Sequence, residues 1–433
     1  MKVIVAKGTL PSRDTELKDL PRDFWHERDI SVYLRSARTK TSKQEGEYRS
    51  TQGATITPIP CWAIEIETTQ RKTPKGFQSL PLTEGSLYFG VTARWAGEVT
   101  GTGSEKEKWR GIRQRGKISL SHCFSVVSSS WLVPFSIAHR YIVHIPAEPT
   151  GSHGREPLRV RHDMANLGKT SLAGFGDDRE SIEEAAIRSW TQQSQRAWSK
   201  QNTDRSTDLV TQWLDYRGKI SIQNPSSYRV VHTRSRSFYA AVVNPQGRTA
   251  SGLPYNAARV IVTEANRVVS SIDIPIAGVI ADNLLHYVNV ESKQEAYWMS
   301  GIFNSTPFEK LVMKEARGEP PGIYTIPQKV LARLGLVFDS EDDTHLKIAQ
   351  LAAALEKKMN GTLRKYLSEE KGLNLELVDD TDRGPDIPPT ISSALMRRLG
   401  AETELRELDN LVLSLISVSK QSTKKQPRIK VFD

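Results

Sequence analysis

The stretch EAYWMSGIFNSTPFEKLVM, residues 295–313, carries the most specific structural signal in the chain. Its apolar residues at helical spacing are Ala296, Met299, Ile302 and Phe303. They predict an amphipathic helix, and the segment 304–307 interrupts it because a residue before proline is disfavoured in the helical region. Ser305 or Thr306 can cap a second helix that has Pro307 at its first position. The stretch therefore predicts two helices joined by a short turn.

The bulk composition favours a globular protein with an anionic partner. The chain has 433 residues, enough for two or three domains, and a formal net charge of +10 with a pI of about 9.4. Nucleic acid is the commonest anionic partner of a basic protein, although many basic proteins bind none. The two cysteines, Cys61 and Cys123, are too few for a disulfide framework or a metal cluster, which predicts a reducing cytoplasm. No run approaches roughly 18 apolar residues, so we expect no membrane partner.

The order of patterns along the chain predicts an α+β fold in four parts. These are an N-terminal β-rich subdomain (1–150), a linker and helix (151–204), a second α/β subdomain (205–338) and a helical C-terminal region with a basic tail (339–433). The expected helices span residues 181–200, 343–367 and 390–418, and the expected strands include 61–67, 228–233 and 237–243. Inserted helices thus accompany a β-rich region.

Three stretches, in this order, resemble a known family. They are QGAT at 52–55, WLDYRGKISIQNPSSYRVVHTRSRSFYAAVV at 213–243, and EAYWMSGIFNS at 295–305. They resemble the C-terminal target-recognition region of adenine-N6 DNA methyltransferases of restriction-modification systems. The resemblance implies sequence-specific recognition of double-stranded DNA in a prokaryotic cytoplasm, as part of DNA methylation and defence.

The catalytic motifs of that family have no match in this sequence. Such an enzyme needs a Gly-rich turn for S-adenosylmethionine and an Asp/Asn-Pro-Pro-aromatic tetrapeptide that accepts the flipped adenine. Asn224-Pro225 is followed by serine, so the second proline is missing, and Gly101 and Gly103 lie in a polar loop. We therefore expect S-adenosylmethionine and catalysis on a partner chain, a methyltransferase catalytic subunit. A nuclease or helicase subunit is a further candidate partner.

The first candidate DNA-binding stretch is 217–248, which contains six Lys or Arg residues and no Asp or Glu. Paired strands would place its two central arginines at a hairpin turn, on one face. The residues expected to hold phosphates are Lys219, Arg229, Arg234 and Arg236. The residues expected to touch base edges are Gln223, Asn224 and Tyr228. A solvated basic hairpin fits the same pattern about equally well.

The second candidate stretch is 106–117, where basic residues surround a tryptophan. The residues concerned are Lys108, Trp109, Arg110, Arg113 and Arg115. Cations beside an aromatic ring can grip phosphates and stack a base. A solvated loop is an equally good interpretation of this stretch.

Two other function classes remain open from the sequence. Glu65 and Glu67, with Lys72, weakly resemble the metal-binding strand of a nuclease subunit of a defence system, although the lysine spacing is wrong. Ser121 and His122 do not form a nucleophile–base pair if they lie in a strand, because adjacent strand residues point to opposite faces. The remaining class is a structural subunit without DNA affinity.

Overall fold

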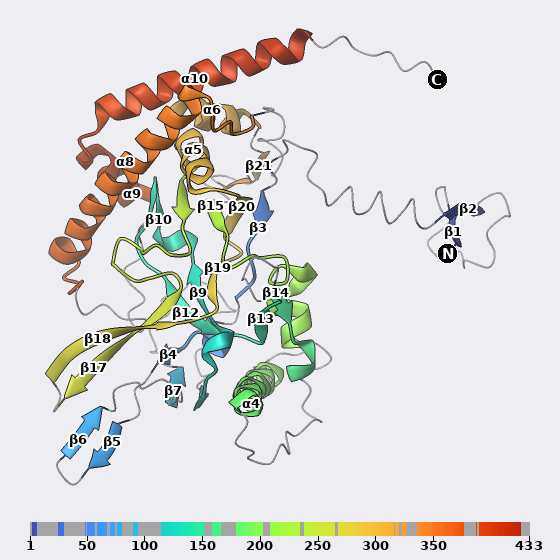
Figure 1. Cartoon of the computed structure of the whole chain (residues 1–433), viewed down its shortest axis with the longest axis vertical. Coiled ribbons are helices and arrows are strands. Elements are labelled where there is room, and N and C mark those ends of the chain that lie inside the picture. Colours follow the sequence, from blue (N-terminus) through green and yellow to red (C-terminus); the bar gives the residue numbers. More distant parts are fainter. Residues whose placement is uncertain are drawn as a thin grey trace.

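The structure, a computed structural model, describes residues 2–6, 25–29, 48, 50–56, 59–66, 70–73, 76–79, 90–93, 114–150, 158–165, 179–201, 208–233, 238–264, 267–315, 317–319, 323–325, 336–375, 387 and 389–425. Helices and several small sheets alternate among these residues, which confirms the predicted α+β class. The strands lie in the middle of the molecule, and the C-terminal helices cover one end of them (Figure 1). Within the described parts, no helix combines the length and apolarity that crossing a membrane requires.

Two sheets form the centre of the molecule. The four-stranded sheet has the antiparallel order β16 (Ala240–Val243), β15 (Tyr228–Thr233), β20 (Leu285–Val290) and β3 (Thr51–Gln52). The three-stranded sheet has the order β12 (Tyr141–His144), β9 (Cys123–Val127) and β19 (Gly278–Ala281), with β19 parallel to β9. Pairing of β15 with β16 confirms the expected pairing of strands 228–233 and 237–243, although β16 begins only at Ala240.

The predicted subdomains 1–150 and 205–338 share both sheets and one apolar core cluster. β9 lies beside β19, and β3 lies beside β20. The residue after β3, Gly53, has its backbone so close to the Asp282 peptide that a Cβ would lie 2.0 Å from the Asp282 carbonyl oxygen. Only glycine fits this contact. The described residues of the two parts therefore fold around a common core.

The stretch 295–313 folds as predicted, into α5 (Lys293–Phe303) and α6 (Thr306–Glu315). Asn304 follows α5, and its side-chain amide bonds to the backbone of Ala240 at the edge of the sheet. The Asn304 Oδ1 atom accepts from the Ala240 N–H at 3.0 Å, and Nδ2 donates to the Ala240 carbonyl at 2.8 Å. The asparagine thus bonds to β16 as a neighbouring strand would, and fixes α5 against the sheet.

The C-terminal helices pack on the far side of α5 (Figure 1). α8 (Asp343–Lys365) continues into a π-helical turn, Tyr366–Glu370, and lies along α5. The prediction of one helix over 390–418 is wrong, because α9 (Pro389–Arg398) ends before Gly400, which has a φ of 60°, and α10 (Glu402–Lys425) follows. Leu408, Val412 and Ile416 are buried on α10, which packs on α6 and α8.

The prediction of a strand over 61–67 is wrong in its first half. Residues Ile59–Trp62 form the short helix α2, and only β4 (Glu65–Ile66) is extended. The short helix packs on α4 (Arg179–Gln201), which confirms the predicted helix 181–200 and donates two hydrogen bonds to the Cys61 carbonyl, a group without a partner inside so short a helix. They come from Trp190 Nε1 at 3.0 Å and Ser194 Oγ at 2.8 Å. Alternating apolar residues alone do not reveal such a distant partner.

The remaining strands form small sheets of two or three strands outside the two central sheets. Paired with one another or with β4, they are β1 (Lys2–Ala6), β2 (Trp25–Asp29), β5 (Gln70–Thr73), β6 (Gly76–Ser79), β7 (Gly90–Ala93), β8 (Gln114–Lys117), β10 (Leu132–Val133), β11 (Ser136–Ile137), β13 (Ala147–Pro149), β14 (Leu158–Val160), β17 (Ala257–Glu264), β18 (Arg267–Pro275), β21 (Arg317–Glu319) and β22 (Ile323–Thr325). β17 and β18 make a long hairpin that projects from the centre (Figure 1).

Two helical glycines provide a matched test of the contact between α5 and α8. A Cβ on Gly301 of α5 would lie 2.8 Å from Ile348 Cγ2, whereas Gly361 of α8 has open space around it. Alanine gains about 1 kcal/mol of helix propensity over glycine at either position. We expect Gly361→Ala to raise the free energy of unfolding by about that amount. Gly301→Ala should lower it by up to about 2 kcal/mol, because overpacking costs about 1–3 kcal/mol and the gain in helix propensity offsets about 1 kcal/mol of this. Urea unfolding measures both, and equal effects would contradict the close contact.

Candidate nucleic-acid interface

The segment 208–223, which precedes β15, contains two irregular turns. Val210–Leu214 is a π-helical turn, and Arg217 has φ 60° and ψ 30°, a left-handed conformation that residues other than glycine rarely adopt. π-helical turns and strained backbone both concentrate at functional sites. The segment is therefore the first place to look for a binding surface.

Buried side chains hold this segment in place from the inside. Asp215 Oδ1 accepts hydrogen bonds from the Ile220 N–H at 2.8 Å and the Ser221 N–H at 3.1 Å. The Gln195 Oε1 atom, on α4, accepts from the Leu209 N–H at 2.8 Å. With its backbone fixed by Asp215 and α4, the segment presents Thr211, Gln212, Tyr216 and Arg217 to solvent.

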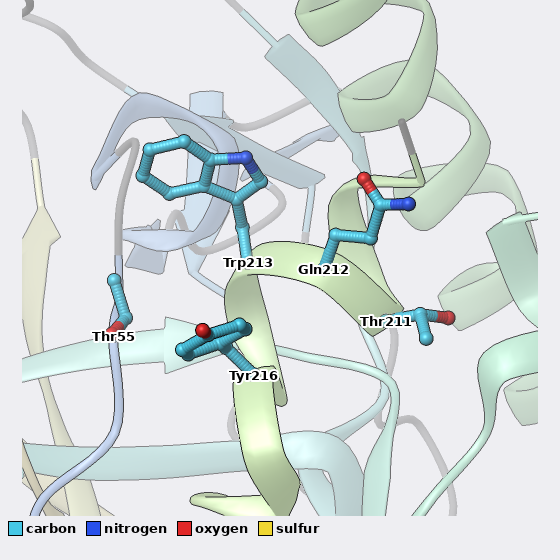
Figure 2. Close-up of a pocket in the computed structure, with 5 residues that line it drawn as sticks. All are labelled: Thr55, Thr211, Gln212, Trp213 and Tyr216. Atoms are coloured by element: carbon cyan, nitrogen blue, oxygen red, sulfur yellow. The ribbon is translucent and has the colours of Figure 1, made fainter. Parts of the chain in front are cut away.

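A pocket of about 590 Å³ opens beside the π-helical turn. Its lining residues are Thr55, Thr211, Gln212, Trp213 and Tyr216. Figure 2 shows the Trp213 and Tyr216 rings extending from the turn towards the segment that carries Thr55. The Trp213 ring is supported from behind by Trp198, at 4.9 Å between ring centroids. The described part of the lining is uncharged and combines two aromatic rings with hydroxyl and amide groups.

Two cations flank the Tyr216 ring at the surface. Arg217 Cζ lies 5.0 Å and Lys219 Nζ 5.9 Å from the ring centroid, within the range of cation–π attraction. The Lys219 ammonium also donates a 2.9 Å hydrogen bond to Gln52 Oε1. Tyr216 is 44% exposed, so an open aromatic ring and two positive charges share one surface. We refer to Gln52, Tyr216, Arg217 and Lys219 as the Tyr216 patch.

The turn between β19 and β20 lies beside this patch. Gln52 Nε2 donates a 3.0 Å hydrogen bond to the Asn283 carbonyl, and the next residue, Leu284, is 51% exposed. Asp282 is buried beneath the turn and accepts a 2.9 Å hydrogen bond from the Leu284 N–H. Burial raises the pKa of the Asp282 carboxyl group to about 6. A buried acid thus holds a turn whose leucine projects at the edge of the patch.

Two of the predicted DNA contacts, Gln223 and Arg229, lie in the interior. Gln223 is fully buried, with Oε1 accepting from the Ala281 N–H at 2.8 Å and from Arg229 Nη1 at 3.1 Å. Arg229 is 1% exposed and also donates to the Val279 carbonyl. Burial lowers the pKa of Arg229 to about 10. The expectation that these two side chains contact DNA is corrected, because neither reaches the surface: they join the segment 208–223 to β19 and β15.

Three other predicted contacts lie among the described residues. Lys219 belongs to the Tyr216 patch, and the side chains of Asn224 and Tyr228 are half-buried. Asn224 Oδ1 accepts from the Ser226 N–H at 3.2 Å, which makes a local turn. The residues outside the described part of the chain are Lys108, Trp109, Arg110, Arg113, Arg234 and Arg236. Arg115 lies in β8, but its side chain is not among those described. Their predicted roles stay predictions.

Ser121 and His122 do contact each other, contrary to the reasoning from strand geometry. They lie in a 3₁₀ turn, Leu120–His122, so Ser121 Oγ is 3.1 Å from His122 Nδ1. Ser121 Oγ also donates to Glu183 Oε2 at 2.9 Å. Burial lowers the pKa of His122 to about 4, which makes it a weak base at neutral pH. The carboxylate binds the serine and not the histidine, so the arrangement differs from a catalytic triad.

Tyr216, Trp213, Gln212 and Thr55 are not among the DNA contacts predicted from the sequence. Arg217 was only the first residue of the basic stretch 217–248. The signal was nevertheless present in Trp213-Leu-Asp-Tyr216-Arg217-Gly-Lys219, where aromatic residues stand beside basic ones. The same combination marked Trp109. What the sequence does not provide is the exposure of Tyr216 or the contact with Gln52.

The described part of the chain holds no group of three or more His, Cys, Asp or Glu side chains that could bind a metal ion. Glu65 lies in β4, and Glu67 is outside the described residues. No protein-family profile matches the chain, and no curated protein matches it. We therefore infer function from the residues of the chain and from the resemblance of its motifs.

Asp282 should make stability fall as the pH rises from about 4 to 6. Its pKa is about 6 in the folded protein and about 3.9 unfolded, so the folded state binds the extra proton in this window. The stabilisation from this proton is fully present below pH 3.9 and is lost above pH 6. The free energy of unfolding of Asp282→Asn, relative to that of wild type, should therefore rise by on the order of 3 kcal/mol between these limits.

Urea unfolding at a series of pH values measures this difference. Asp339→Asn is the matched control, because Asp339 is exposed and its Oδ1 also accepts from an N–H two residues ahead, that of Glu341. A pH-independent difference between Asp282→Asn and wild type would contradict the buried carboxyl group.

Proposed function

We propose that this chain binds double-stranded DNA through the Tyr216 patch, as the target-recognition part of an adenine-N6 DNA methyltransferase assembly. One observation carries the proposal: Arg217 and Lys219 lie over an exposed tyrosine ring, next to a pocket whose described lining includes two aromatic rings. Cations of this kind bind phosphates, and side chains between them reach base edges. Among the described residues, Arg217 forms no ion pair that would neutralise it.

The position of the family-like motifs also supports the proposal. QGAT contributes Gln52 and Thr55, and the stretch 213–243 contributes the patch residues Tyr216, Arg217 and Lys219. More than 150 residues separate the two motifs, yet Lys219 bonds to Gln52, and Thr55 lines the same pocket as Tyr216. Motifs that resemble one family in sequence thus meet at one surface, as the residues of a shared binding site do.

Catalysis in this proposal belongs to a partner chain. The partner carries S-adenosylmethionine and the adenine pocket, and the assembly acts in a prokaryotic cytoplasm. The chain described here contributes the choice of the DNA site. The net charge of +10 favours its association with the anionic duplex.

Replacing the cations tests the DNA-binding surface. We expect Arg217→Ala and the double variant Arg217→Ala/Lys219→Ala to bind every duplex more weakly. With fewer phosphate contacts, binding releases fewer counterions from the DNA. The slope of log affinity against log salt should shrink by about one per lost phosphate contact. Fluorescence anisotropy of the full chain with a labelled duplex, over a series of salt concentrations, gives both quantities.

Lys371→Ala is the matched control for these variants. Lys371 Nζ also lies over a tyrosine ring, at 5.7 Å from the Tyr366 centroid, but Tyr366 is buried in the helical layer. The control removes the same charge and a similar contact away from the patch, so its affinity and salt slope should match wild type. Equal losses in the control and in Arg217→Ala would attribute binding to net charge alone and reject the patch.

A further inference from the structure

We propose that the pocket between Thr55, Trp213 and Tyr216 takes one nucleobase that is unstacked from the bound duplex. This inference deepens the proposed function and rests on it: the Tyr216 patch would hold the backbone while the pocket holds a base. The pocket adjoins the patch directly, because Tyr216 belongs to both.

The chemistry of the lining fits a nucleobase better than a phosphate. The described residues that line the pocket are uncharged, whereas phosphate sites collect cations or backbone N–H groups. Two aromatic rings offer flat surfaces of the kind on which bases stack. The Gln212 amide and the Thr55 hydroxyl are donors and acceptors suited to a base edge, whereas Thr211 Oγ1 lies 3.2 Å from His162 Nδ1. The cations that a nucleotide's phosphate needs, Arg217 and Lys219, stand outside at the rim.

The backbone that shapes the pocket is irregular. The π-helical turn Val210–Leu214 carries Thr211, Gln212 and Trp213, and the left-handed Arg217 directly follows Tyr216. Residues three positions apart share one face of a helical turn. Figure 2 shows that Trp213 and Tyr216 extend to the same side of the segment. Both rings therefore lie on one side of one opening.

The pocket is large enough to admit a base. Its volume of about 590 Å³ lies within the range of small-molecule sites, roughly 300–1,000 Å³. The nearby Leu284, exposed on the turn that Gln52 binds, is an apolar side chain of the kind that other proteins insert between base steps. A base leaves the stack at a cost of a few kcal/mol, which is least where pairing is already broken.

The experiment compares a fully paired duplex with the same duplex containing one central mismatch. We expect the wild-type full chain to bind the mismatched duplex at least about fivefold more tightly, because the unstacking cost is smaller. Tyr216→Ala should lose most of the mismatch preference, since base–aromatic stacking contributes about tenfold in affinity. Tyr216→Phe keeps the ring and should keep the preference.

The outcomes separate this inference from the proposed function. Tyr216 is exposed, so its substitution leaves the core intact. If wild type binds both duplexes with salt-dependent but equal affinity, or Tyr216→Ala keeps the preference, the base pocket is rejected while the DNA-binding surface stands. If wild type binds neither duplex, the proposed function fails and the base pocket fails with it.

Discussion

The side-chain amide of Asn304 bonds to the outer edge of the four-stranded sheet as another strand would. It bonds to both the N–H and the carbonyl of Ala240, and the carbonyl also accepts from the Phe135 N–H at 2.8 Å. The position of the helical layer depends on this contact. α5 packs on β15 and β16, α8 packs on α5, and α10 packs on α8. Phe303 and Phe308, stacked with ring centroids 5.1 Å apart, add an apolar contact beneath the same turn.

The sequence predicted those elements whose causes are local. Helical periodicity and capping residues located α4, α5, α6 and α8, and the pairing of β15 with β16 followed from two adjacent apolar runs. The errors have distant or conformational causes. Residues Ile59–Trp62 are helical and not extended, at the place where α4 donates to the Cys61 carbonyl. The C-terminal helix breaks where Gly400 adopts a positive φ. Neither a partner more than a hundred residues away nor a backbone torsion can be read from hydrophobic periodicity.

The candidate site was predicted less well than the fold, because charge does not reveal exposure. Arg229 looks like a surface cation in the sequence, yet it is buried and bonds to Gln223 and the Val279 carbonyl. Lys219 comes from the same basic stretch and does reach the surface, where it bonds to Gln52. Which arginine or lysine of a stretch faces outward depends on turns such as that of Arg217, whose left-handed backbone no composition indicates.

The division between buried anchors and exposed contacts has a consequence for evolution. Asp215 and Gln223 hold the backbone of the segment 208–223 through hydrogen bonds inside the protein. Thr211, Gln212 and Tyr216 face solvent and contribute little to that support. Exposed side chains of this kind usually change stability by less than about 0.5 kcal/mol when substituted. A lineage can therefore vary the outer side chains, and with them the ligand preference, without having to refold the scaffold at each step.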